Sequence, residues 1–235
     1  MALDVTKINQ EELTPNQYFK EDCSAIKKQL VIHFSAGAPS ATNMIHGWQF
    51  NPERVGTAFG ISRGWNNPNE RDGEIFQAFG SKYYAYHIAF SKNTNKVPSK
   101  YHNFTLETQR AKESVAVEIC NWGCLIKDKD GNFRNYVNGI VPANEVVTLD
   151  KPHRGYIYYH DFSVNQIASL KELIIYLCDK YKISKKYNPD MWDISTRALD
   201  GENGIWGHCS FRSDKFDVAP LPKLVKMLQD IEAGI

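Results

Sequence analysis

The chain has 235 residues, enough for one large domain or two small ones, and 42% of them are hydrophobic, which suffices for a buried core. Its 28 lysine and arginine residues almost balance 27 aspartate and glutamate residues, and a net charge of +1 gives no long-range field that would favour nucleic acid or an anionic membrane. We therefore expect one globular domain, without nucleic acid or membrane insertion, whose partner is chosen by a local site.

The first 15 residues are a polar lead that contains acidic residues and no apolar segment. Such a lead is neither a secretory signal nor a membrane anchor. We expect the chain to be made and kept in the cytoplasm unless something else exports or releases it.

The first predicted strand is the apolar run QLVIHF at residues 29–34, which the small and turn-forming residues 35–40 bring to an end. His33 lies near the carboxyl end of this strand, where open α/β sheets place their sites. Residues 40–50 follow as a predicted short helix.

A hairpin with an elaborated loop is predicted next. Residues 55–62 and 74–79 have the composition of two strands, and the polar insert 64–72 separates them before the turn pair Asp72-Gly73.

A further pair of strands is predicted around a turn. The valine-rich segment 114–119 alternates weakly and contains Glu118, and the turn signal at 128–131 predicts a connection to a strand at 132–137. Glu118 is thus expected in or beside a core strand.

Two helices are predicted towards the C-terminus. Apolar residues recur at helical spacing over 163–181, with Ser163 as a suitable N-cap, and again over 223–233 after Pro220 and Pro222. No repeat or long linker divides the chain.

The five cysteines are odd in number and lack paired CxxC spacing, which argues against a disulfide framework and against a structural zinc module. We expect reduced, mostly buried thiols at Cys23, Cys120, Cys124, Cys178 and Cys209.

Residues able to bind a metal or transfer a proton occur in three segments: His33 after its strand, Glu118 within a strand, and the run GHCSFRSDKFD at 207–217. A lone histidine is more often a packed or surface residue than a ligand. Composition and spacing alone therefore do not identify an enzyme.

Five blocks in order resemble the type-2 N-acetylmuramoyl-L-alanine amidases, a family that includes phage lysozyme-like amidases and peptidoglycan recognition proteins. They are QLVIHFSAG, VGTAFGISR with RDGEIFQAF, AYHIAFS, SVAVEICNWG and GIWGHCSFRSDKFDVAP. The similarity runs from about residue 16 to the C-terminus. It implies an N-terminal lead at 1–15, an amidase catalytic domain at 16–235, and a single α/β domain with a central mixed β-sheet flanked by α-helices.

The resemblance also implies one zinc ion per chain. The first zinc histidine of the family falls on His33, the second on His208, and the third ligand, which is Asp or Cys in different members, on Asp217. Three protein ligands leave a fourth position for water, whose pKa falls on zinc from about 15.7 to about 7. Cys209, beside His208, is expected to be a buried small residue, because adjacent side chains on an extended loop point apart.

Further roles carry over residue by residue. The acid/base carboxylate of the family falls on Glu118, and the lysine that supports the oxyanion falls on Lys215. His87 matches a histidine of the substrate-cleft wall, although it also suits an ordinary packed strand. Arg212 is expected either to grip a peptide carboxylate or to brace its loop through Asp214.

Two departures from the family are visible. Some phage members carry a tyrosine where this chain has Thr57, and threonine cannot replace a phenol. Residues 63–71 and 91–103 resemble insertions, which could widen or lid a groove or form idle surface.

The implied function is hydrolysis of the amide that joins the lactyl group of N-acetylmuramic acid to L-alanine of the stem peptide, by a monomeric phage-type endolysin that reaches the cell wall after release. Two alternatives stay open: a peptidoglycan-binding module without catalysis, and a cytoplasmic amidase that recycles free muropeptides.

Overall fold

A six-stranded mixed β-sheet forms the centre of the protein in the computed structural model, which describes residues 3–37, 40–65, 67–91 and 97–235. Its strands, in spatial order, are β1 (Asn9–Gln10), β4 (Ile75–Gln77), β3 (Phe59–Ile61), β5 (Ser114–Ile119), β2 (Gln29–Phe34) and β11 (Gly204–Gly207). β3, β5, β2 and β11 are parallel, whereas β4 is antiparallel to β3. The predicted mixed sheet is confirmed.

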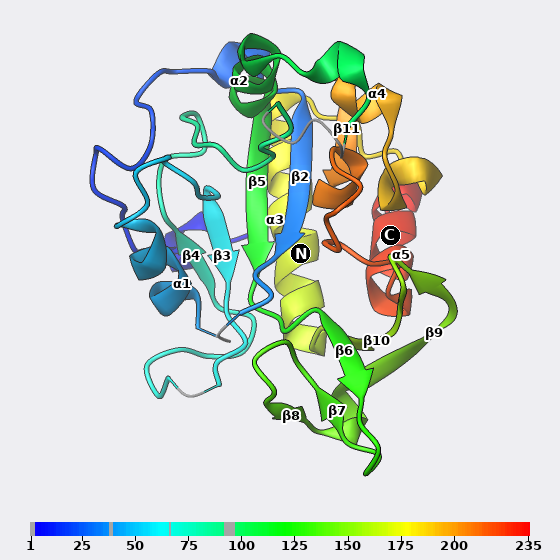
Figure 1. Cartoon of the computed structure of the whole chain (residues 1–235). Helices are drawn as coiled ribbons and strands as arrows, with labels where there is room; N and C mark the ends of the chain where they lie inside the picture. The colour runs from blue at the N-terminus through cyan, green and yellow to red at the C-terminus, as the bar shows by residue number, and fades with distance from the viewer. Residues whose placement is uncertain (1–2, 38–39, 66, 92–96) are drawn as a thin grey trace.

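Among the described residues, five α-helices surround this sheet: α1 (Ala41–Trp48), α2 (Phe104–Glu113), α3 (Val164–Tyr181), α4 (Thr196–Leu199) and α5 (Pro222–Ala233). In Figure 1, α3 runs behind β2 and β5, and α5 packs beside α3. Short 3-10 turns occupy Val5–Lys7, Ser24–Ile26, Ser99–Tyr101, Ala143–Glu145, Pro189–Trp192 and His208–Ser210. No helix within the described residues is long and apolar enough to span a bilayer.

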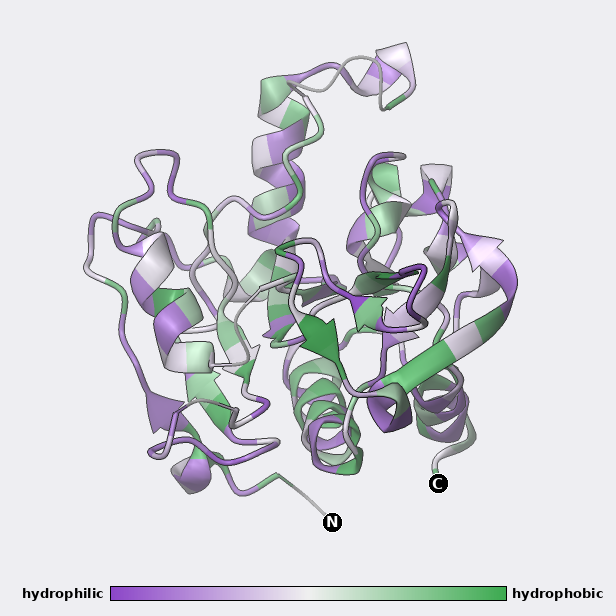
Figure 2. Ribbon diagram, turned by 60° about the horizontal axis from the view of Figure 1, so that its bottom comes forward, coloured by the Kyte–Doolittle hydropathy of each residue, from purple (hydrophilic) through white to green (hydrophobic). Residues whose placement is uncertain are grey.

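The position of β2 within the apolar core explains why its sequence is mostly hydrophobic. All six residues of β2 are buried, because other strands flank it on both sides and helices cover the sheet. Figure 2 shows hydrophobic residues concentrated in the central strands, while most connecting loops are hydrophilic.

Helix α3 begins where its cap predicts. The Ser163 hydroxyl accepts a hydrogen bond from the backbone N–H of Gln166, and the Gln166 side chain accepts one from the Ser163 N–H, which completes a capping box. The buried Gln166 amide also donates to the carbonyl oxygens of Ser62 and Cys120, at 3.3 and 2.8 Å. These contacts fasten the start of α3 to the carboxyl end of the sheet.

The N-terminal lead packs against the rest of the chain. β1 pairs with β4 through Asn9 and Phe76, and the side chains of Ile8 and Leu13 are buried in the main core. A domain boundary at residue 15 stays a prediction.

Several predicted elements are shorter than expected. The strands expected at 55–62 and 74–79 are formed only at 59–61 and 75–77, and the helix expected at 40–50 spans 41–48 after the N-cap Ser40. Residues 55 and 56 leave the sheet because their backbone pairs with Tyr86 instead.

A second sheet of five antiparallel strands corrects the prediction for the segment after β5. Its order is β8 (Ile140–Val141), β7 (Phe133–Arg134), β6 (Cys124–Lys127), β10 (Tyr156–His160) and β9 (Val146–His153). The turn at 128–131 forms, but it joins β6 to β7 and not to β5, and the strand expected at 132–137 covers only 133–134. Gly123, with a φ of +71° and the Phe34 ring against its Cα, redirects the chain after β5.

Candidate active site

The candidate site lies at the carboxyl end of the main sheet, above the second sheet (Figure 1). His33 on β2 is the register partner of Glu118 on β5. His208 directly follows β11, which pairs with β2 on its other side. The loop after His208 then turns back, and the backbone N–H of Cys209 donates to the carbonyl oxygen of Asp217 at 2.6 Å, which brings Asp217 beside His208.

Three potential ligand atoms converge there. The Nδ1 atoms of His33 and His208 are 3.0 Å apart, and Asp217 Oδ2 lies 3.1 Å from the first and 3.0 Å from the second. All three side chains are buried. Within the described part of the chain, no other trio of His, Cys, Asp or Glu side chains is grouped closely enough to hold a metal ion.

The geometry fits a tetrahedral zinc ion. Bonds of about 2.0–2.2 Å at tetrahedral angles place neighbouring ligand atoms about 3.3 Å apart, close to the three separations seen here. Two imidazole nitrogens and one carboxylate oxygen form a ligand set typical of catalytic zinc, and all three residues line one pocket.

Electrostatics keep two of the three side chains, His33 and Asp217, in the protonation states that bind a metal. Burial and the neighbouring His208 lower the pKa of His33 to about 4, so its imidazole is neutral at pH 7. Burial alone would raise the pKa of Asp217, but His208 and His33 hold it well below its ordinary value. A neutral imidazole and an ionised carboxylate are the forms that bind a metal.

His33, His208 and Asp217 line a pocket of about 340 Å³. Glu118 and Lys215 line it together with the ligands, and Trp48 and Phe216 contribute aromatic walls. The Phe216 ring packs edge-on against Tyr156 of β10 with centroids 5.4 Å apart, so the second sheet borders this pocket.

Glu118 and Lys215 both line this pocket. Neither side-chain charge has a hydrogen-bond or ion-pair partner among the described residues. Burial and the nearby Asp217 carboxylate raise the pKa of Glu118 well above its ordinary value, and Lys215 opposes this shift. A carboxyl group with a raised pKa beside a metal site is suited to accept and return a proton.

His87 lies behind His33 and also reaches the pocket. Its Nδ1 is 3.1 Å from His33 Nε2, and its Nε2 is 2.8 Å from the Ser114 hydroxyl. Burial and the two neighbouring histidines, His33 and His208, lower the pKa of His87 well below its ordinary value. The sequence indicated the residue but not this hydrogen-bonded position.

Of the two roles expected for Arg212, the structure shows the one in which it braces its loop through Asp214. Its guanidinium donates to both carboxylate oxygens of Asp214, at 3.0 and 2.7 Å, and to the carbonyl oxygen of Ala89 at 3.2 Å. The guanidinium is therefore engaged within the protein, and a grip on a substrate carboxylate stays a prediction. Thr57 lines the pocket, but its hydroxyl donates to the Phe59 carbonyl.

The cysteines match the expectation from their spacing. All five thiols are free, and all except Cys124 are buried. The Cys209 thiol donates to the carbonyl oxygens of Met191 and Val218, away from the three ligands. Of the two inserted loops, residue 66 and residues 92–96 lie outside the described residues.

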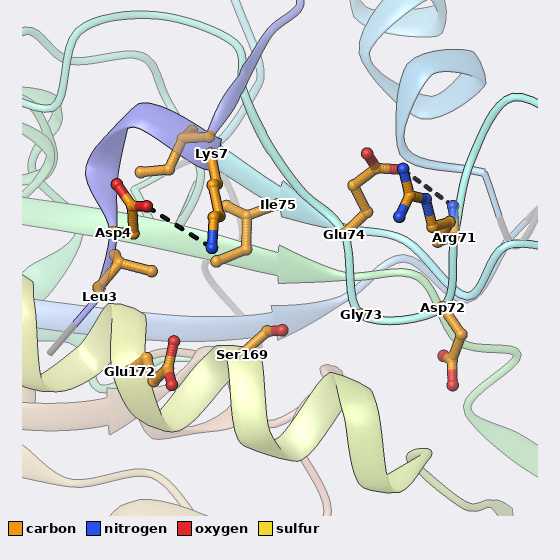
Figure 3. A pocket seen from close by; sticks show the side chains of 11 residues that line it. Leu3, Asp4, Lys7, Arg71, Asp72, Gly73, Glu74, Ile75, Ser169 and Glu172 are labelled. Carbon is orange, nitrogen blue, oxygen red and sulfur yellow. Dashed lines mark hydrogen bonds and ion pairs between the residues drawn. The ribbon is translucent and has the colours of Figure 1, made fainter. Parts of the chain in front are cut away.

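A larger cavity of about 710 Å³ lies elsewhere, between the N-terminal lead, the loop at 71–75 and α3 (Figure 3). Among the charged side chains that line it, Lys7 lies 3.6 Å from Asp4, and the Glu74 carboxylate accepts a hydrogen bond from the backbone N–H of Arg71. The residues that line it include none of the predicted site residues.

Comparison with known proteins extends this picture. Residues 24–220 match the family model described as N-acetylmuramoyl-L-alanine amidase. No curated protein sequence matches the chain.

Solved structures to which the chain is similar include PlyL (13% identity, TM-score 0.49, covering 97% of this chain and 98% of that one). A mutant endolysin from Bacillus subtilis has 15% identity and a TM-score of 0.48 over 100% and 99% of the two chains. An AmpD derivative has 14% identity and a TM-score of 0.45 over 97% and 99%. Because the family model spans most of the sequence, including every residue of the site described above, the chain belongs to the N-acetylmuramoyl-L-alanine amidase family.

Proposed function

We propose that this protein is a zinc-dependent N-acetylmuramoyl-L-alanine amidase that cleaves the amide between the lactyl group of N-acetylmuramic acid and L-alanine of the stem peptide. The observation that carries the proposal is the convergence of His33, His208 and Asp217 within about 3 Å of one another, in a pocket that Glu118 and Lys215 also line. Membership of the amidase family supports the choice of this amide as the bond that is cut.

The side chains divide the chemistry among them. His33, His208 and Asp217 would hold one zinc ion, which when bound supplies Lewis acidity that activates water and polarises a carbonyl. Glu118 takes a proton from the attacking water and returns it to the leaving amine of L-alanine. The Lys215 ammonium faces the carbonyl oxygen and stabilises the negative charge that develops there.

The substrate is proposed to be polymeric peptidoglycan, with the protein acting as a phage-type endolysin on the cell wall after release from the cytoplasm. The five free thiols agree with synthesis in a reducing compartment. A monomer is sufficient for this proposal, because one chain provides all three ligands and both catalytic groups.

The decisive experiment measures zinc content and release of stem peptides from purified sacculi, before chelation, after chelation and after zinc is restored. The proposal predicts about one zinc per chain and chelator-sensitive release of peptides with a new N-terminal alanine. Binding to sacculi without cleavage would favour a recognition module. Cleavage of soluble muropeptides but not of sacculi would favour a recycling enzyme.

A further inference from the structure

We propose that His87 is a positioning residue for the metal centre, which fixes the tautomer and orientation of His33 through a relay that ends at Ser114. The proposal rests on the zinc site proposed above and assigns His87 a role other than contact with substrate.

The relay is a continuous line of side chains. His33 Nε2 lies 3.1 Å from His87 Nδ1, His87 Nε2 lies 2.8 Å from Ser114 Oγ, and Ser114 Oγ donates to the Arg110 carbonyl oxygen at 2.8 Å. All four residues are buried. The line therefore runs from the metal-facing end of β2 to the end of α2.

The direction of each hydrogen bond follows from the end that faces the metal. His33 presents Nδ1 to the other two ligands, so this nitrogen needs its lone pair and the proton of the neutral ring resides on Nε2. His33 Nε2–H then donates to His87 Nδ1, which places the His87 proton on Nε2 and directs it to Ser114 Oγ. The Ser114 proton goes to the Arg110 carbonyl, so every group in the line has one consistent role.

The other ligand imidazole is oriented by the next residue of the same segment. His208 Nε2 lies 3.3 Å from the carbonyl oxygen of Ile88, which accepts its proton and leaves Nδ1 for the metal. Arg212 bonds the carbonyl oxygen of Ala89 one residue later. The segment at 87–89 thus orients both histidine ligands and is itself held in place by Arg212.

Both ring nitrogens of His87 are engaged in the relay, so neither is left to donate to or accept from a substrate. Hydrogen bonds of this kind to a metal-bound histidine raise its basicity and hold its ring, and their loss weakens metal affinity by about 10–100-fold.

A matched pair of variants isolates the contact to His33. In His87→Asn the side-chain oxygen can occupy the place of Nδ1 and still accept from His33, whereas His87→Gln places its amide near the position of Nε2 and keeps only the contact to Ser114. His46→Ala, which removes an exposed histidine of α1, is the control. Zinc affinity is measured by competition with a chromogenic chelator, and the melting temperature is measured on the metal-free proteins.

The expected result is zinc affinity reduced about 10–100-fold in His87→Gln, a smaller reduction in His87→Asn, and no change in His46→Ala. Ser114→Ala, which removes the acceptor of the His87 proton, should reduce zinc affinity less than His87→Gln. Metal-free melting temperatures that fall equally in the Asn and Gln variants, with equal zinc affinities, would show a merely structural role and overturn the proposal.

Zinc affinity that stays at the wild-type value in His87→Gln would overturn it as well. The readout does not use peptidoglycan, so a wild-type protein that binds zinc but cleaves no substrate would contradict the proposed function and leave this inference intact.

Discussion

His33 and Glu118 are direct neighbours across the parallel strands β2 and β5. In a parallel pair, the side chains of register partners project from the same face of the sheet, and the backbone hydrogen bonds between the strands fix the distance between them. The proposed metal ligand and the proposed proton carrier are therefore placed by two adjacent central strands of the sheet, while His208, Lys215 and Asp217 come from the segment after β11.

The first prediction concerns Glu118→Gln. Removal of the ionisable carboxyl group should lower kcat by about 10²–10⁴-fold, because proton transfer to the leaving amine loses its carrier. Zinc content should stay at the wild-type value, because Glu118 is not among the three ligands. Amide-cleavage assays with parallel metal analysis test this, and a fully active variant would remove Glu118 from the mechanism.

Loss of a ligand should have the opposite signature. In His208→Ala two donors remain, so the variant should lose zinc at micromolar free metal and lose activity with it. Zinc should raise the melting temperature of the wild type, and chelation should reverse this, whereas the variant should respond to neither. His46→Ala is the matched control, and a zinc-dependent shift in His208→Ala would contradict the ligand assignment.

Lys215→Met tests the stabilisation of developing charge. Its ammonium lines the pocket without a partner among the described residues, so removing the charge should lower kcat by about 10²–10³-fold and leave zinc affinity unchanged. Lys186→Met, at an exposed position, serves as the control. An effect confined to KM would assign Lys215 to substrate binding instead.

Glu70 should be among the side chains on which stability depends most. Its buried carboxylate accepts hydrogen bonds from the Ser40 and Ser62 hydroxyls, the Ala41 N–H and the Asn67 amide, which tie the start of α1 to the loop after β3. Glu70→Ala removes the acceptor that these donors share and should lower the free energy of unfolding by about 2–4 kcal/mol. Urea unfolding measures the loss. The exposed Glu12→Ala should change it by less than about 0.5 kcal/mol, and an equally small effect of Glu70→Ala would disprove the assignment.

The last prediction is a dependence on pH. Burial and the nearby Arg63 lower the pKa of His160 from 6.5 to about 3, and its Nδ1 accepts the backbone N–H of Trp122, which only the neutral ring can do. Below pH 6.5 the unfolded chain binds a proton at this residue that the folded protein does not. Its contribution to stability is thus complete above this pH and falls by about 1.4 kcal/mol for each pH unit towards pH 3.

His160→Gln should flatten that dependence. Urea unfolding of the metal-free proteins at pH 7, 6 and 5 should show the wild type losing stability more steeply than the variant. Parallel curves for the two proteins would mean that His160 does not bind this proton differentially.

Much of the site was predictable because its residues occur in blocks with distinct family patterns. His33, Glu118, His208, Lys215 and Asp217 do lie around one pocket, and the long amphipathic helix α3 and the buried strand β2 match their predicted bounds closely.

Other helices and strands show no clear hydrophobic periodicity in their sequences. Helix α2 buries Glu107, Arg110 and Glu113, whose polar groups are satisfied by hydrogen bonds and ion pairs, so its sequence does not show an apolar stripe. Strands β6, β7 and β8 of the second sheet are short and largely exposed or half-buried, so their sequences carry no clear alternation. The position of His87 behind His33 depends on a contact between residues 54 apart, which no local pattern reports.

The distance along the chain between the proposed metal ligands also has a consequence for folding. His33 and Asp217 are 184 residues apart, and they meet only when β2 and β11 have paired and the loop after β11 has turned back. Contacts of such high sequence separation form late, because the entropy of closing the intervening loop opposes them. Zinc should consequently bind after the sheet has assembled, and the bound ion should slow unfolding. The rate at which zinc is bound during refolding should therefore report when the native topology is complete.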